Sequence, residues 1–117
     1  MPLELRRRLA DGFVVIEVEG DLDIATDATF REFVVESLDR DSVNAVVDLS
    51  RLSFIGAAGL SSLIGLDLYA TTVGGTLRLA CSQPVFDRVL RAAGLAGRFV
   101  CYPSVEAAMA QSTTPPS

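Results

Sequence analysis

The chain has 117 residues, a net charge of -5 and an apolar fraction of 50%, which is typical of one folded domain rather than of a disordered segment. It contains no histidine and no lysine, so all ten basic residues are arginines. This excludes histidine general bases and lysine Schiff bases. The acidic balance disfavours contact with nucleic-acid phosphates, and the composition favours a binding module over an enzyme.

No segment of the chain predicts secretion or membrane insertion. Acidic residues interrupt the stretch after Arg6–Arg8, so no signal peptide is expected. The weakly polar stretch from Phe54 to Leu66 is too short to span a bilayer. Two cysteines are too few for a disulfide scaffold. We therefore expect a soluble cytoplasmic protein with no membrane partner, no metal and no cofactor.

Apolar periodicity and turn residues predict strands that alternate with helices. In chain order the sequence predicts a strand at 3–9, a strand at 13–18, a helix at 27–40, a strand at 43–49, a helix at 57–73, a strand at 76–80, a helix at 84–94, a strand at 98–101 and a last helix capped by Ser104. Asp11-Gly12 predicts a hairpin between the first two strands. The stretch Gly20–Asp23 is expected to end the second strand.

This order of elements predicts an α/β fold. After the opening hairpin, each helix separates two strands, which implies a mostly parallel sheet with right-handed crossovers. We expect a small mixed sheet of four or five strands, with about four helices mainly on one face. The single domain is expected to span residues 1–111, and residues 112–117 are expected to form a flexible C-terminal tail.

The most specific segment runs from Val46 to Leu60 and reads VVDLSRLSFIGAAGL. It resembles the DLSxxxFIDSSGL pattern of STAS domains of the bacterial anti-sigma factor antagonist type. Three further motifs of that family occur in the family's order: GDLD at 20–23, GGTLRL at 74–79 and LRAAGL at 90–95. The resemblance extends from Leu3 to about Ala110. It implies the STAS fold and a non-enzymatic regulator that acts by docking.

The resemblance also implies a partner and a switch. In that family, an anti-sigma factor with a histidine-kinase-like ATPase fold phosphorylates a serine at the start of this second helix, and the unphosphorylated antagonist binds the kinase and frees the sigma factor. Here Ala58 stands at the serine position, Ala57 replaces its neighbour, and Gly56 removes the preceding carboxylate. We therefore expect an anti-sigma factor antagonist that is not controlled by phosphorylation at the usual site.

By the same resemblance, the expected partner surface combines the acidic turn with the start of the second helix. It comprises Asp21, Asp23, Gly56, Ala57, Ala58, Gly59, Ser61 and Ser62. The alternative for the two aspartates is a solvated loop whose carboxylates satisfy the turn backbone. The alternative for the small residues is close packing of the helix against the sheet. Phosphate on Ser61 or Ser62 would provide a substitute switch.

Two residue pairs and the choice of partner stay open at this level. Leu66 and Tyr69 form either an exposed apolar patch for a partner or a homodimer, or a surface that a neighbouring helix covers. Cys81 and Cys101 are either a redox pair or two ordinary buried thiols. The alternative function is an accessory STAS module that binds a transporter ATPase or a larger sensory assembly.

Overall fold

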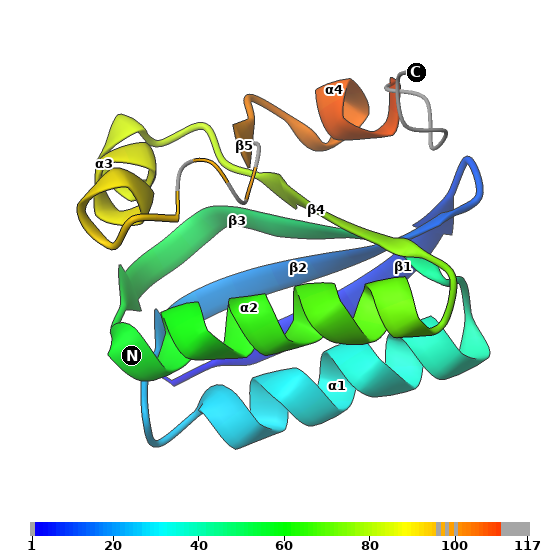
Figure 1. Ribbon diagram of the computed structural model, residues 1–117, viewed down its shortest axis with the longest axis horizontal. Coiled ribbons are helices and arrows are strands. Elements are labelled where there is room, and N and C mark those ends of the chain that lie inside the picture. Colours follow the sequence, from blue (N-terminus) through cyan, green and yellow to red (C-terminus); the bar gives the residue numbers. More distant parts are fainter. Residues whose placement is uncertain (1, 96, 98, 100, 111–117) are drawn as a thin grey trace.

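Figure 1 shows the computed structural model, which describes residues 2–95, 97, 99 and 101–110. The strands are β1 (Glu4–Ala10), β2 (Phe13–Leu22), β3 (Asn44–Ile55), β4 (Thr76–Ala80) and β5 (Cys101–Tyr102). The helices are α1 (Asp27–Arg40), α2 (Ala57–Thr72), α3 (Pro84–Ala92) and α4 (Val105–Ala110). The tail predicted at 112–117 lies outside the described residues.

The strands form one sheet in the order β1-β2-β3-β4-β5. β1 and β2 are antiparallel, and the other neighbours are parallel. The first pair is joined by a two-residue turn in which Asp11 has φ 51° and Gly12 has φ 83°. Positive φ at both positions matches the right-handed twist of a hairpin. The predicted α/β fold with a mixed, mostly parallel sheet is thus confirmed.

The helices cover the two faces of the sheet unequally. α1 and α2 lie side by side on one face (Figure 1), and α3 contributes to the same core. Successive parallel crossovers of one hand, made in one direction across the sheet, leave their helices on one face. Ile16, Phe30 and Leu66 are buried in this core. α4 packs on the other face, where its Val105 joins Val15 in a smaller cluster.

β2 and β3 are longer than the sequence predicts. The predicted breaks at Gly20–Asp23 and after Leu49 are wrong, because β2 continues to Leu22 and β3 to Ile55. The two extensions pair with each other, with two register shifts. Gly20 has φ 104°, and a β-carbon on it would overlap the carbonyl oxygen of Pro2. The glycine therefore shapes an irregular strand instead of ending it, since a neighbouring strand is present to satisfy the backbone.

The last strand includes Cys101 from its predicted range of 98–101 and continues to Tyr102. β5 consists of Cys101 and Tyr102, whereas residues 98 and 100 lie outside the described residues. Its position is set by β4, because Leu79 pairs with Cys101 and the Cys81 N–H donates to the Tyr102 carbonyl oxygen at 2.8 Å. The described part of β5 therefore lies beside the C-terminal end of β4.

Most predicted helix boundaries agree with the structure, and the caps explain why. Gly74 adopts φ 84° directly after α2, which is the usual conformation beyond a helix end. A β-carbon on Gly75 would overlap the Val43 carbonyl oxygen, so only glycine fits there. The Ser104 hydroxyl oxygen accepts a hydrogen bond from the Ala107 N–H at 3.0 Å, as the predicted cap requires.

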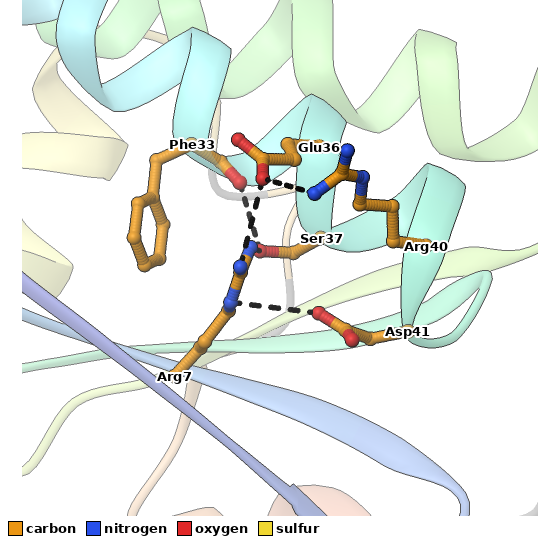
Figure 2. Close-up of polar contacts among 6 residues, drawn as sticks. All are labelled: Arg7, Phe33, Glu36, Ser37, Arg40 and Asp41. Atoms are coloured by element: carbon orange, nitrogen blue, oxygen red, sulfur yellow. Dashed lines mark hydrogen bonds and ion pairs between the residues drawn. The ribbon is translucent and has the colours of Figure 1, made fainter.

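Arg7 ties the edge strand β1 to α1 (Figure 2). Its guanidinium lies 3.6 Å from carboxylate oxygens of both Glu36 and Asp41 and 5.2 Å from the centre of the Phe33 ring. It also donates to the hydroxyl oxygen of Ser37 at 3.4 Å. One arginine side chain thus holds the last two turns of α1 against β1.

Candidate functional site

The acidic turn and the start of α2 lie next to each other because β2 and β3 end side by side. Asp21 pairs with Phe54, and Leu22 pairs with Ile55, in parallel register. Immediately after this pairing, the Gly56 N–H donates to the carbonyl oxygen of Leu22 at 3.0 Å. The structure therefore brings the two halves of the predicted partner surface together, although they are more than 30 residues apart in the sequence.

The acidic turn is organised by its own side chains. The Thr26 hydroxyl donates to the carbonyl oxygen of Asp21 at 2.8 Å and accepts from the Asp23 N–H at 3.0 Å. The Asp23 carboxylate accepts from the Ala25 N–H at 2.9 Å. This is the turn-stabilising role that the sequence left as an alternative. Asp21 and Asp23 are nevertheless partly exposed, so both roles are compatible with the geometry.

The start of α2 presents backbone rather than side chains. Gly56 is extended at φ -99° and no side chain caps the helix. Ala57 is exposed and Ala58 is half-buried. Uncapped N–H groups at a helix start carry partial positive charge. The helix start is therefore a partly exposed surface with backbone donors and no hydroxyl group at either alanine.

Gly59 lets this helix start lie close to the sheet. A β-carbon on Gly59 would be 2.9 Å from the Leu22 carbonyl oxygen and 2.9 Å from a side-chain carbon of Ile55. Glycine is therefore required here by packing, which is the second alternative that the sequence left open for the small residues. The same carbonyl oxygen of Leu22 accepts the hydrogen bond from Gly56.

The two serines of the predicted surface have different environments. Ser61 is exposed, whereas Ser62 is only 4% exposed and faces the core. Solvent therefore reaches the side chain of Ser61, whereas that of Ser62 is covered in the folded helix. The burial of Ser62 follows from its position one turn before Leu66, which also faces the sheet.

Two exposed apolar residues flank the predicted surface, and sequence patterns alone do not identify them. Ile24 is 84% exposed in the acidic turn, and Phe54 is 54% exposed at the end of β3. The sequence places Phe54 in a loop that leads into the helix. One signal for Ile24 is present, namely an isoleucine directly after the acidic turn residue Asp23, in a segment where polar turn residues are more usual.

Of the two alternatives left open for Leu66 and Tyr69, the exposed apolar patch does not hold for Leu66. That side chain is 2% exposed, because the buried face of α2 includes position 66 together with 59, 62, 63 and 70. Tyr69 is partly buried, and its hydroxyl donates to Asp39 Oδ1 on α1 at 2.5 Å. This hydrogen bond, with smaller contributions from burial and the Asp39 charge, raises the pKa of Tyr69 above 10.0.

Cys81 directly follows β4, and Cys101 is the first residue of the neighbouring strand β5. Neither cysteine is in a disulfide; Cys81 is buried and Cys101 is half-buried. Cys101 pairs with Leu79, two residues before Cys81, so the two thiols belong to neighbouring segments of the chain. The redox pair stays a prediction beside the alternative of two ordinary thiols.

Metal-binding clusters and membrane-spanning helices do not occur in the described part of the chain. No group of three or more histidine, cysteine, aspartate or glutamate residues there is arranged to hold a metal ion. No described helix is long and apolar enough to cross a bilayer.

The sheet order, the helix layers and the helix start beside the ends of β2 and β3 define a small α/β domain with one mixed sheet. A family model described as "STAS domain" matches residues 5–108, and the chain belongs to this family. A Mycobacterium tuberculosis protein with the provisional name of anti-anti-sigma factor is 26% identical over 106 residues, which cover 89% of this chain and 72% of that protein.

Solved structures share the fold. The crystal structure of an anti-sigma factor antagonist from Mycobacterium paratuberculosis has a TM-score of 0.82 at 23% identity and covers 92% of each chain. A sulfate transporter family protein from Wolinella succinogenes has a TM-score of 0.74 at 15% identity, with coverage of 88% of this chain and 86% of that one. The fold therefore occurs both in a protein named as an anti-sigma factor antagonist and in a protein of the sulfate transporter family.

Proposed function

We propose that this protein is an anti-sigma factor antagonist, which binds an anti-sigma factor and thereby releases a sigma factor. Its similarity to the Mycobacterium tuberculosis protein named as an anti-anti-sigma factor, and to the anti-sigma factor antagonist from Mycobacterium paratuberculosis, supports this function. The absence of histidine and lysine from the sequence supports a docking role rather than catalysis. A cytoplasmic location follows from the nature of the proposed partner.

The observation that carries the proposal is the geometry at the start of α2. Exposed Ala57 and half-buried Ala58 lie beside the partly exposed acidic turn, and Ile24 and Phe54 add exposed apolar area. A surface with an apolar centre and charged edges is typical of protein–protein interfaces. The proposed partner is an anti-sigma factor of the serine kinase type with a histidine-kinase-like ATPase fold.

The proposed regulation differs from the usual switch of the family. Ala58 carries no hydroxyl group, so a kinase has no phosphate acceptor at that position. A phosphate adds about -1.5 to -2 charges, which would disrupt a docking surface that already contains Asp21 and Asp23. Without this phosphate, the antagonist binds its partner in the presence and absence of ATP. Binding is then controlled through the expression level of the antagonist or through the partner.

Binding between the purified chain and an anti-sigma factor kinase encoded in the same genome tests the proposal. Isothermal titration is expected to give a dissociation constant that ATP does not change. Ala57→Arg places a bulky cation on the proposed surface and is expected to weaken binding at least tenfold. The matched control is Leu68→Arg, at an exposed position 11 residues further along the same helix, or about 16 Å away.

The outcomes separate this function from its alternatives. Equal binding by both arginine variants would reject the start of α2 as the docking surface. Dissociation upon addition of ATP, with phosphate on this protein, would reject the proposed lack of a switch. The fold shared with the sulfate transporter family protein supports a second candidate, an accessory module for a transporter ATPase or a sensory assembly. Copurification with such a subunit, and no kinase binding, would favour it.

A further inference from the structure

An apolar hollow of about 200 Å³ lies between the end of β3 and α3. Its apolar lining consists of Leu49, Leu52, Phe54, Ile55, Phe86 and Val89. The remaining lining residues, Ser53 and Gln83, are polar but uncharged. The described lining therefore offers apolar contact and no charged partner.

The hollow exists because β3 extends beyond β4. β4 pairs with β3 only as far as Asp48, so among the described residues no strand accompanies 49–55 on that edge. On this open edge of β3, the carbonyl oxygen of Ser50 accepts a hydrogen bond from Gln83 Nε2 at 2.6 Å. α3 then approaches the open edge with the side chains of Phe86 and Val89.

Size and charge decide what kind of group fits the hollow. A cavity of about 150 Å³ accommodates benzene, whereas pockets for cofactors and drug-sized ligands usually measure about 300–1,000 Å³. A hollow of about 200 Å³ therefore fits one large side chain better than a nucleotide or another cofactor. A charged group would lose its hydration there without gaining an ionic partner, which favours an apolar side chain.

Phe54 connects this hollow to the proposed docking surface. It is 54% exposed and lines the hollow, and its Cε2 would lie 3.3 Å from a β-carbon on Gly56. Across the strand pair, Phe54 is in register with Asp21. The hollow, the start of α2 and the acidic turn are thus continuous through one aromatic side chain.

We infer that the protein partner that docks at the start of α2 inserts one apolar side chain into this hollow and places a basic residue opposite the acidic turn. The basic residue complements Asp21 and Asp23, and the apolar one displaces water from the Phe54 and Val89 walls. This inference rests on the proposed function and identifies the chemistry of the partner surface.

Titration of the purified anti-sigma factor kinase from the same genome against three variants of the full chain tests the inference. Val89→Phe fills the hollow, and Phe54→Ala removes one wall. Both are expected to weaken binding at least tenfold. Leu68→Ala is the matched control, because Leu68 and Phe54 are 56% and 54% exposed, and it is expected to change binding less than twofold. Thermal unfolding of each variant establishes that it is folded.

Each result has a defined meaning. Unchanged binding by either folded hollow variant would overturn the inference while leaving the proposed function intact. Equal weakening by Leu68→Ala would also overturn it, because the loss would then reflect general apolar area. Failure of the unaltered chain to bind the kinase would instead overturn the proposed function. If Val89→Phe does not fold, Val89→Met takes its place, because its longer side chain also fills the hollow; unchanged binding by the folded Val89→Met variant would overturn the inference.

Discussion

The backbone N–H of Gly56 donates a hydrogen bond to the carbonyl oxygen of Leu22 at 3.0 Å. This bond joins the residue before α2 to the last residue of β2. It fixes the start of α2 beside the acidic turn without the use of any side chain. Because a β-carbon on Gly59 would meet the same carbonyl oxygen at 2.9 Å, the entry angle of α2 depends on Leu22 through two contacts.

The crowded position of Gly59 predicts that Gly59→Ala destabilises the fold. The added methyl group would press against backbone and core atoms, so we expect the free energy of unfolding to fall by about 1–3 kcal/mol. Gly65→Ala in the same helix is the control, since no described atom of another element lies within 4 Å of its added methyl group. Gly65→Ala is expected to raise the free energy of unfolding by about 0.5–1 kcal/mol. Urea unfolding measures both, and effects of equal sign would contradict this account.

The missing hydroxyl group at position 58 predicts that Ala58→Ser creates a phosphorylation site. We expect the partner kinase with ATP to add one phosphate to Ala58→Ser and none to the unaltered chain. The phosphate would be favoured by the helix start, yet its charge would weaken binding to the kinase at least tenfold. Intact-mass spectrometry and titration measure these effects, with Ser61→Ala in the same background to locate the phosphate. Phosphate on the unaltered chain would disprove the prediction.

The hydrogen bond from Tyr69 to Asp39 predicts a change in the titration of this tyrosine. It raises the pKa of Tyr69 above 10.0, so Asp39→Asn should lower that pKa towards its ordinary value. Ultraviolet titration in a Tyr102→Phe background isolates Tyr69, because the chain has two tyrosines. An unchanged titration would show that the bond is not maintained in solution.

The same bond predicts the direction of a pH effect on stability. The folded state holds the Tyr69 proton more tightly than the unfolded state does. The stabilisation is therefore complete below about pH 10 and is lost as the pH rises through the higher pKa of the folded state. The melting temperature of the Tyr69→Phe variant should accordingly lie below that of the unaltered chain at pH 8 and approach it at higher pH. A difference that grows above pH 10 would contradict this direction.

The contacts of Arg7 predict that its side chain contributes more to the stability of the fold than an ordinary surface ion pair does. Arg7→Ala removes the approach to Phe33 together with two ion pairs, and we expect a loss of about 1–2 kcal/mol. Arg40→Ala is the control. Arg40 shares Glu36 with Arg7, but the Arg40 side chain is 71% exposed. Arg40→Ala should therefore lower the free energy of unfolding by less than about 0.5 kcal/mol. Urea unfolding at low and high salt should show a smaller Arg7 effect at high salt.

Local patterns predicted much of the fold. β4 spans the predicted residues Thr76–Ala80, and α2 begins at the predicted Ala57, because apolar periodicity and glycine stops act over a few residues. The extensions of β2 and β3 were not predicted. Gly20 and Ser50 favour a break when only local conformation is considered, and only the presence of the neighbouring strand makes the longer ladder favourable.

The covalent structure alone shows that position 58 carries no hydroxyl group and that the chain has no histidine or lysine. Local periodicity also predicted the order of strands and helices. The burial of Leu66, the exposure of Ile24 and Phe54, and the position of the acidic turn beside the start of α2 became visible only in the folded chain. Exposure and proximity depend on which elements pack together, and residues distant in the sequence set that packing.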